Sequence, residues 1–258
     1  MEIAPSQNQF DRQAAMYATS AVHRSGPSLP VLVEFAGVQS GERALDVATG
    51  TGNTAFAIAE QGAAATGVDI SAGMLAQARD RAEREGALVE FVEGSAENLP
   101  FPDGSFDLVT ARHAPHHFHD VPRFLREVYR VLVPGGRFVM SDGTSPTSEA
   151  SDWFDRWQRL RDPSHFYSRT VEEWRALTDE AGFRRVRDTI VPYRLEFDWW
   201  TRQSGCTPET IDELRRHAAS ASPSIRETVG LEMDENDQPV AFHEPMLVVR
   251  LERGSEPQ

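Results

Sequence analysis

Between an apolar strand and a helix-like run, the chain reads Leu45-Asp46-Val47-Ala48-Thr49-Gly50-Thr51-Gly52-Asn53-Thr54. Glycines in such a loop let the backbone turn tightly and approach a ligand closely. A second acidic residue, Asp69, follows the next apolar run, residues 64–68. A carboxylate at this position in a nucleotide-type site accepts hydrogen bonds from ribose hydroxyls. The pattern therefore predicts the first half of such a site.

The glycine loop departs from the loop that binds dinucleotides. That loop has three glycines in the order G-x-G-x-x-G, whereas this one starts at Ala48 and lacks a useful third glycine. Asp46, at the end of the strand, would repel a pyrophosphate and attract an ammonium group. These residues disfavour an NAD-type oxidoreductase and favour a ligand that carries a positive charge.

Composition excludes several classes of function. Of the 258 residues, 40% are hydrophobic and 26% are charged, which is typical of a globular protein with a real core. The formal net charge of -14 opposes binding to nucleic-acid phosphates. Every basic residue is arginine, so lysine Schiff-base chemistry is excluded. Cys206 is the only cysteine, which excludes an internal disulfide and a cysteine-based zinc site.

The chain also carries no sign of membrane insertion or export. No apolar run approaches the roughly 18 residues of a membrane span. The first residues contain neither a basic region nor a long apolar run, so no signal peptide is expected. We expect a cytoplasmic protein without a membrane partner.

From Arg43 onward the apolar pattern alternates between strand and helix. Alternation of this kind favours an α/β fold with a doubly wound parallel sheet. Ser71 is a suitable N-cap for one of the helices. The chain starts with an amphipathic helical segment at 1–30 and a short helix at 29–35. Strands are then predicted at 43–47, 64–69, 88–92, 106–111 and 137–141. Helices are predicted at 54–61, 72–85 and 121–132.

The last third of the chain predicts further elements around a long insertion. A helix at 171–181 precedes strands at 183–190 and 246–252. Between these strands, residues 192–240 are too long for a structureless loop and contain two helical patterns, at 197–203 and 208–219. We interpret the insertion as a helical cap that shapes a substrate pocket, with a small packing subdomain as the alternative.

Five motifs, in order, resemble those of the class I S-adenosylmethionine-dependent methyltransferases, and most closely the ubiquinone/menaquinone-biosynthesis-like group. The motifs are Asp46-Val-Ala-Thr-Gly-Thr-Gly52, Val68-Asp-Ile-Ser71, Ser95-Ala-Glu-Asn-Leu-Pro-Phe101, Phe106-Asp-Leu-Val109 and Arg130-Val-Leu-Val-Pro-Gly-Gly136. The resemblance implies a Rossmann-like sheet of seven strands whose last strand is antiparallel, and residues 246–252 suit that place.

The resemblance also implies a division of the single domain 1–258. Residues 1–40 would form an N-terminal helical lid, residues 41–142 the cofactor-binding core, and residues 143–258 the substrate-side half with its helical insertion. The implied cofactor is S-adenosyl-L-methionine, which becomes S-adenosyl-L-homocysteine after methyl transfer.

The glycine loop would hold the methionine part of this cofactor, by resemblance to the family. Gly50 and Gly52, with Ala48 and Thr51 in the same loop, would let the backbone approach it. Asp46 would face the ammonium group, directly or through water.

Other implied contacts come from later strands and from the N-terminus. They are Asp69 on both ribose hydroxyls, Ile70 on the adenine face, Ser95 and the backbone of Ala96 at the adenine edge, Arg112 mainly by its backbone, and Tyr17 over the methionine carboxylate. Many relatives have aspartate where Ser95 stands, so this contact departs from the family pattern. Tyr17 has the alternative of an ordinary core aromatic.

Four histidines, His113, His116, His117 and His119, fall within seven residues after a strand. Three alternatives stand: a metal site with a nearby carboxylate, packing and capping of the following helix, or a general base whose pKa lies near working pH. We expect no metal, because a short loop rarely points three adjacent imidazoles at one ion.

Asp142, at the end of the next predicted strand, favours the base. The carboxyl ends of neighbouring parallel strands meet in one crevice, where a carboxylate can orient an imidazole. In some natural-product O-methyltransferases a similar His-His motif works with a late aspartate. This resemblance points to His116 or His117 with Asp142.

The preferred function is therefore methyl transfer from S-adenosylmethionine to a small apolar or aromatic metabolite, with oxygen as the favoured acceptor atom. Trp153, Trp157, Trp199 and Trp200 are candidates for pocket walls or for core packing. The alternative is an enzyme that uses the bound cofactor for cyclisation, elimination or decarboxylation. We expect a small-molecule substrate, no nucleic-acid partner, and a monomer or homodimer.

Overall fold

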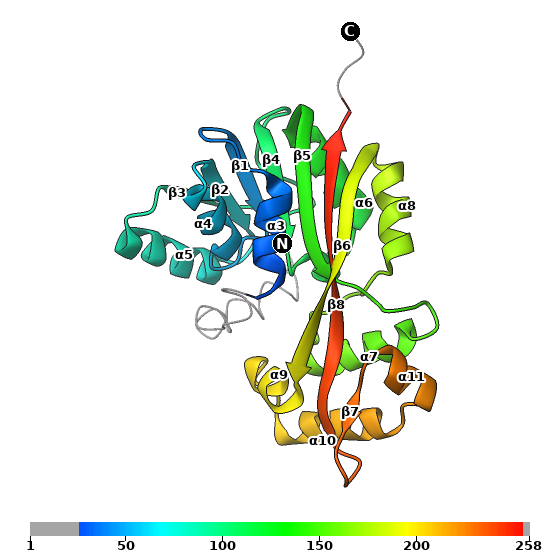
Figure 1. The fold of residues 1–258 in the computed structure, drawn as a ribbon. Coiled ribbons are helices and arrows are strands. Elements are labelled where there is room, and N and C mark those ends of the chain that lie inside the picture. Colours follow the sequence, from blue (N-terminus) through cyan, green and yellow to red (C-terminus); the bar gives the residue numbers. More distant parts are fainter. Residues whose placement is uncertain (1–25, 255–258) are drawn as a thin grey trace.

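A twisted sheet organises residues 26–254, the part of the chain that this computed structural model describes. Its main path has the strand order β3-β2-β1-β4-β5-β8-β6 (Figure 1). The strands are β1 (Arg43–Val47), β2 (Ala64–Asp69), β3 (Val89–Glu93), β4 (Phe106–Arg112), β5 (Leu132–Gly143), β6 (Phe183–Glu196) and β8 (Pro239–Arg253). The first five are parallel, and β8 lies antiparallel between β5 and β6. This confirms the predicted doubly wound sheet with an antiparallel last strand.

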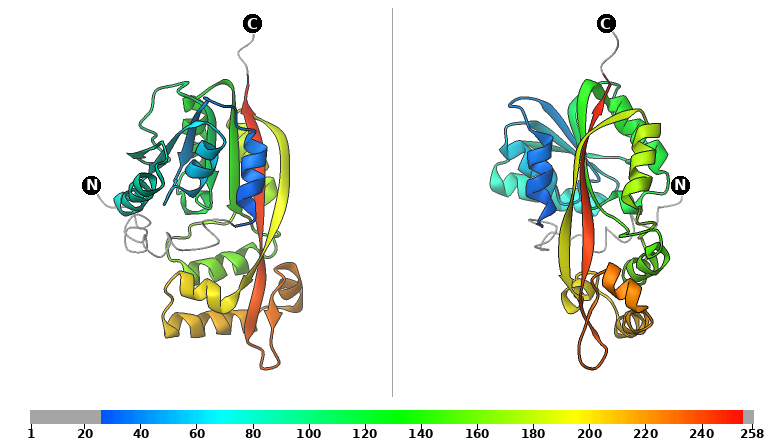
Figure 2. Two further views of the ribbon diagram at one scale, coloured as in Figure 1. Left: turned by 60° about the vertical axis from the view of Figure 1, so that its left-hand side comes forward. Right: turned by 45° about the vertical axis from the view of Figure 1, so that its right-hand side comes forward.

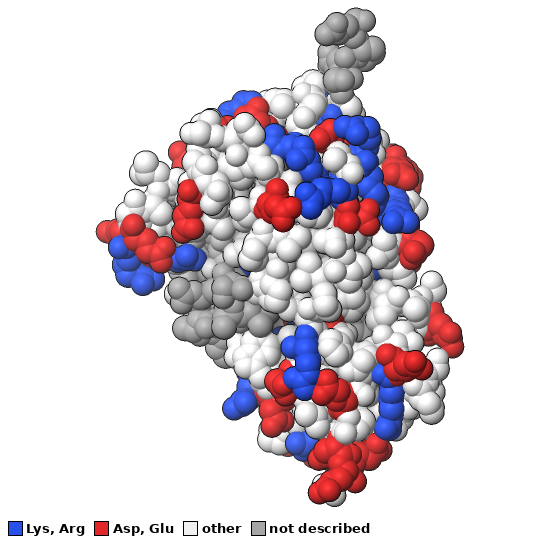
Figure 3. All heavy atoms as spheres, viewed as in Figure 1, with Lys and Arg blue, Asp and Glu red and all other residues white. Residues whose placement is uncertain are grey.

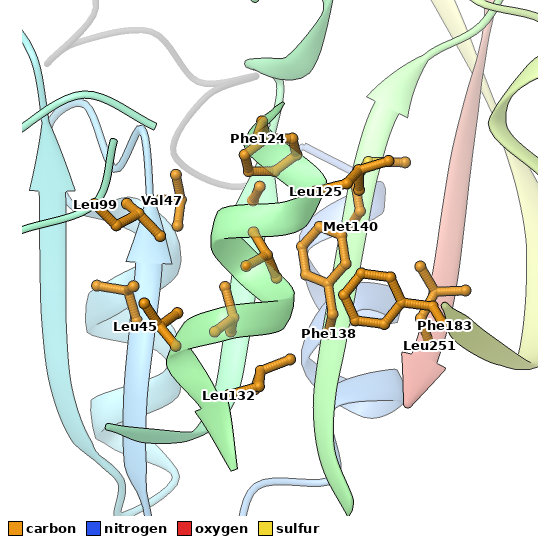
Figure 4. Packing of buried hydrophobic residues seen from close by; sticks show 14 of the residues in the cluster. Leu45, Val47, Leu99, Phe124, Leu125, Leu132, Phe138, Met140, Phe183 and Leu251 are labelled. Atoms are coloured by element: carbon orange, nitrogen blue, oxygen red, sulfur yellow. The ribbon is translucent and has the colours of Figure 1, made fainter. Parts of the chain in front are cut away.

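Helices cover both faces of the sheet because its strands alternate their side chains between the faces. On β1, Leu45 and Val47 join the apolar cluster that also contains Phe124 and Val128, whereas Ala44 joins the cluster that contains Leu32. Figure 4 shows members of the first of these clusters, among them Leu45, Phe124 and Phe138. The helices are α3 (Ser28–Ala36), α4 (Asn53–Glu60) and α5 (Ala72–Glu85) on one face, and α6 (Val121–Val131) and α8 (Val171–Glu180) on the other.

Local signals set the ends of these helices. The Ser71 side chain accepts a hydrogen bond from the Met74 amide at 3.1 Å, so the predicted N-cap of α5 is confirmed. Asp120 caps α6 in the same way, through the Arg123 amide at 2.9 Å.

The strand after α6, β5, starts at Leu132, five residues earlier than the predicted 137. Its register with β4 shifts between the pairs Phe106–Leu132 and Leu108–Arg137.

The predicted boundaries of the insertion, residues 192–240, are wrong. Strand β6 continues to Glu196 and β8 begins at Pro239, so the two strands leave the sheet as a paired ribbon (Figure 2). Their backbones pair over this extension, and Tyr193 and Phe242 bury their side chains in the apolar cluster beside it. The inserted segment is therefore residues 197–238.

A cap of four helices packs on the far end of the ribbon (Figures 1 and 2). Helices α9 (Phe197–Gln203) and α10 (Pro208–Ala219) have the predicted bounds, whereas α7 (Ser151–Arg161), α11 (Pro223–Thr228) and the short β7 (Glu232–Met233), an eighth strand, were not predicted. Trp157 and Trp200 stack in the core of the cap with ring centroids 5.0 Å apart. The cap therefore has an apolar core of its own.

Charge is distributed unevenly over the face shown in Figure 3. Acidic and arginine side chains alternate over the upper part, while acidic side chains gather at the lower tip. Asp234, Glu235 and Asp237 are exposed there, in the turn between β7 and β8.

Among the described residues, no helix has the length and apolar character needed to cross a membrane.

Candidate functional site

The glycine loop after β1 turns through three left-handed backbone conformations. Ala48, Gly50 and Gly52 have φ angles of 52°, 54° and 85°. A Cβ atom on Gly52 would lie 2.8 Å from the Phe56 ring and 3.0 Å from the Phe91 ring. Glycine is therefore required at position 52 by both conformation and space.

Asp69 ties this loop to the end of β2. Its Oδ2 atom accepts a hydrogen bond from the Gly50 amide at 2.7 Å, and its Oδ1 atom accepts one from the Ser71 amide at 2.9 Å. An ionised carboxylate offers about four lone-pair sites. Asp69 therefore shapes the loop from the end of β2.

Asp46 is a buried carboxylate beneath the same loop. It accepts hydrogen bonds from the Thr49 hydroxyl at 2.6 Å and from the Thr110 hydroxyl at 2.8 Å. Burial raises the pKa of Asp46 to about 6, although both hydroxyls and the Arg112 charge oppose the shift. Asp46 is thus still largely ionised at neutral pH, and a cation beside it would favour the ionised form.

The loop borders a cavity of about 220 Å³ at the carboxyl ends of β1, β2 and β4. The predicted cofactor residues that line it are Asp46, Ala48, Gly50, Thr51, Asp69, Ile70, Ser95, Ala96 and Arg112. Gly52 lies in the loop but not in the lining, and Tyr17 lies outside the described residues. Thr49 and Met74 also line the cavity, although the sequence interpretation did not include them.

Two of the lining side chains are engaged differently from the family expectation. The Arg112 side chain, expected to contribute mainly backbone, is buried, and its Nε donates to the Thr54 hydroxyl at 3.2 Å. The Ser95 hydroxyl accepts a hydrogen bond from the Glu97 amide at 3.2 Å. Ser95 therefore stabilises the turn that follows β3 as well as lining the cavity.

His116 and Asp142 form a close pair. His116 lies in the 3-10 turn η1 (Pro115–His117) after β4, and Asp142 lies near the end of β5. Their Nδ1 and Oδ1 atoms are 2.7 Å apart, and Asp142 is buried. Burial lowers the pKa of His116, but the charge and hydrogen bond of Asp142 outweigh it, so the pKa lies above its ordinary value.

The adjacent His117 has a different environment. Its Nδ1 is 3.0 Å from the backbone oxygen of Ser164, and its ring centroid is 4.1 Å from that of His116. Burial, followed by the neighbouring His116 charge, holds the pKa of His117 well below its usual value. Of the two predicted histidines, His116 is thus the one that Asp142 contacts.

A third imidazole, His165, belongs to the segment after α7. Its ring stacks on His116 with centroids 5.2 Å apart, and its Nε2 lies 3.1 Å from Asp155. The amides of Phe166 and Tyr167 both donate to the backbone oxygen of His116, at 2.9 and 3.1 Å. The segment therefore holds the η1 turn in place.

A second, smaller cavity of about 70 Å³ lies between η1 and the cap. His113 and His117 line both cavities, so the two spaces meet at these imidazoles. The other lining residues come from η1, the end of β5, α7 and the segment after it, the β6–β8 ribbon and α9. They include His116, His165, Gln158, Arg161, Tyr193, Trp199, Trp200 and Glu244.

The remaining candidate residues make other contacts. His119 packs on Phe166 with centroids 4.6 Å apart and lines the first cavity. Trp153 and Trp157 stack with centroids 5.4 Å apart, and Trp157 is buried in the core of the cap. Across residues 26–254, no three His, Cys, Asp or Glu side chains converge in a way that could hold a metal ion.

Comparison with known proteins places the site in context. Residues 45–140 match the family model described as a methyltransferase domain. The uncharacterized methyltransferase YcgJ of Bacillus subtilis is 33% identical over 92% of this chain and 94% of its own length. The crystal structure of YcgJ superposes with a TM-score of 0.83, at 31% identity, over 88% of this chain and 98% of that one.

Two further proteins show the range of similarity in sequence and in fold. A demethylmenaquinone methyltransferase of Thermus thermophilus is 40% identical over 58% of this chain and 66% of its own length. The [4+2]-cyclase SpnF shares the fold, with a TM-score of 0.64 at 23% identity, over 92% of this chain and 84% of that one.

Proposed function

This chain belongs to the class I S-adenosylmethionine-dependent methyltransferases, and we propose that it methylates a small apolar or aromatic acceptor at a hydroxyl oxygen. The cofactor is S-adenosylmethionine, which supplies an electrophilic methyl group on a positively charged sulfur when it is bound. The geometry of the His116–Asp142 pair carries the proposal for oxygen.

The first cavity fits this cofactor by the chemistry of its walls. The Asp46 carboxylate suits an ammonium group, and the Asp69 carboxylate, which lines the same cavity, suits hydroxyl donors such as those of a ribose. Ile70 and Met74 offer apolar surface to the adenine. We propose that these residues, with the glycine loop, hold the cofactor.

The acceptor would enter the second cavity, which we call the acceptor chamber. It would meet the methyl group where the two cavities join, beside His113 and His117. Such a displacement needs mainly alignment of the acceptor oxygen, the methyl carbon and the sulfur. The apolar faces of Trp199 and Trp200 suit an aromatic acceptor.

His116 is positioned to take the proton of the acceptor. When its Nδ1–H donates to Asp142, its Nε2 carries a free lone pair, and within the described residues Nε2 makes no hydrogen bond. We propose that Nε2 removes the hydroxyl proton while the oxygen bonds to the methyl carbon. The carbon–sulfur bond breaks with its electrons left on sulfur, and Asp142 stabilises the imidazolium.

A turnover assay with a panel of phenols tests this function. The wild-type protein should form S-adenosylhomocysteine and a methyl ether in equal amounts. His116→Ala should lower turnover by about 10²–10⁴-fold with cofactor affinity nearly intact. His243→Ala, which removes an exposed histidine of β8, is the matched control.

Two results would overturn the proposal. Wild-type turnover by His116→Ala would show that no base acts at this position. A product formed without S-adenosylhomocysteine would assign the chain to enzymes that use the cofactor for another reaction, such as cyclisation, elimination or decarboxylation.

A further inference from the structure

We propose that Arg161 binds a carboxylate on the acceptor, so that the substrates of this enzyme are small hydroxy acids. This inference rests on the proposed function, because it concerns the acceptor chamber. It adds a second recognition point to the chamber, at the C-terminal end of α7, and it names the chemical class of the substrate.

Arg161 is held in place by the cap. Its Nε donates to the backbone oxygen of Trp200 at 3.1 Å, and its guanidinium carbon lies 4.9 Å from the centroid of the Trp200 ring. Because Trp200 is itself buried in the core of the cap, the guanidinium has a fixed support. Arg161 is therefore a preorganised side chain in the wall of the chamber.

The charge of Arg161 is only partly balanced in this wall, by the longer-range charges of Asp162 and Glu244. Among residues 26–254 it forms no salt bridge, although it is half-buried. Arginine stays charged at all physiological pH values, and an unpaired cation that has lost part of its water is costly. An anion that enters the chamber would remove this cost.

The acidic residues near Arg161 are already engaged by neutral donors. Asp162 accepts hydrogen bonds from the Ser164 amide at 2.9 Å and the Ser164 hydroxyl at 2.7 Å. Glu244 accepts one from the Gln158 side-chain amide at 3.0 Å, and burial raises its pKa. Both carboxylates act on the Arg161 charge without forming a salt bridge among the described residues.

The chemistry of the wall favours a carboxylate over other anions. The planar guanidinium fork matches the two oxygens of a carboxylate. A phosphate carries nearly two charges, so Asp162 and Glu244 would oppose it more strongly. The small volume of the chamber, about 70 Å³, favours a small acceptor. Its hydroxyl would face His116 while its carboxylate meets Arg161.

Calorimetry on the protein saturated with S-adenosylhomocysteine tests the inference with benzoate, salicylate and 4-hydroxybenzoate. Benzamide serves as the neutral match for benzoate. At least one of the three acids should bind the wild-type protein, and Arg161→Gln should weaken it by about tenfold or more, since a charge-assisted pair is lost. Arg161→Lys should weaken it less, because it keeps the charge but not the fork.

The control is Arg156→Gln, which removes an exposed arginine from the same helix and should bind the acids as the wild type does. Affinity for S-adenosylhomocysteine should be unchanged in each variant, which also reports a folded protein. If Arg161→Gln does not fold, Arg161→Lys with the same acids decides the question.

Three results would overturn the carboxylate assignment: no binding of any acid by the wild type, equal binding of benzamide and benzoate, or unchanged affinity in the Arg161 variants. The proposed methyl transfer can fail separately. Acids that bind through Arg161 without forming S-adenosylhomocysteine from the methyl donor would leave the anion site in place and refute methylation. If neutral phenols are methylated and Arg161→Gln is as active on them as the wild type, with no effect of Arg161 on the acids, methyl transfer would stand and the carboxylate assignment would fail.

Discussion

The Nδ1 atom of His116 lies 2.7 Å from Oδ1 of Asp142, and this contact joins the turn after β4 to the end of β5. The two strands are parallel neighbours, with Arg112 paired to Ser141 directly before the two residues approach each other. The carboxyl ends of such strands meet in one crevice. The sheet therefore brings together an imidazole and a buried carboxylate from positions 26 residues apart.

Replacing Asp142 by asparagine should lower the plateau rate and move the pH profile. A base must be unprotonated, so the wild-type rate should rise with pH through the His116 pKa, which lies above 6.5 because Asp142 favours the imidazolium. Asp142→Asn removes that charge, so the midpoint should move to lower pH while the plateau falls by about 10²-fold or more. The measurement is turnover against pH. Asp80→Asn, which changes an exposed acid, is the control and should keep the wild-type profile. An unchanged midpoint and plateau in Asp142→Asn would contradict the role of Asp142.

Cofactor affinity should depend on pH through Asp46. Burial raises the pKa of this carboxylate to about 6, and its ionised form would attract the ammonium group. Affinity for S-adenosylhomocysteine should therefore be highest above pH 6 and fall by up to about tenfold per unit as pH drops below it. Calorimetry between pH 5 and pH 7 measures this. Asp46→Asn keeps the histidines, and it should bind S-adenosylhomocysteine more weakly at pH 7. Its affinity should also change less with pH. If its affinity changes with pH as steeply as that of the wild type, the pH dependence belongs to other groups.

Asp69→Asn should weaken binding of S-adenosylhomocysteine by about 1–3 kcal/mol, because charge-assisted hydrogen bonds to the ribose would be lost. Asparagine is the sharper test than alanine, since Asp69 also accepts the Gly50 and Ser71 amides and asparagine keeps one acceptor oxygen. Calorimetry gives the affinity and thermal unfolding gives the stability. Equal affinities of variant and wild type would remove Asp69 from the ribose site.

Alanine at Gly50 and at Gly52 should have different effects on the stability of the free protein. Both glycines have positive φ, so each variant should lose roughly 1 kcal/mol from backbone strain. A Cβ atom at Gly50 meets open space, whereas one at Gly52 meets the Phe56 and Phe91 rings, so Gly52→Ala should lose more. Urea unfolding of both variants checks the order. Equal losses would mean that the two rings move aside at little cost.

Local sequence signals were sufficient for most helices and strands of the core and for the cap of α5, but not for the start of β5. The N-cap at Ser71, the bounds of β1, β2 and α5, and the loop around Gly50 and Gly52 depend on residues close together in the chain. Capping, side-chain period and the conformational freedom of glycine act over a few residues, so they can be read without knowledge of the fold. The positions of Asp46 and Asp69 at strand ends followed from the same signals.

Only the tertiary structure decided the acceptor side. Adjacent residues of a chain carry no local signal that would place His116, rather than His117, on Asp142. The extension of the β6–β8 ribbon, the stacking of His165 on His116 and the support of Arg161 by Trp200 join segments far apart in sequence. Such contacts depend on strand order, register and the packing of the cap, which arise from the whole set of buried surfaces and not from the period of any one segment.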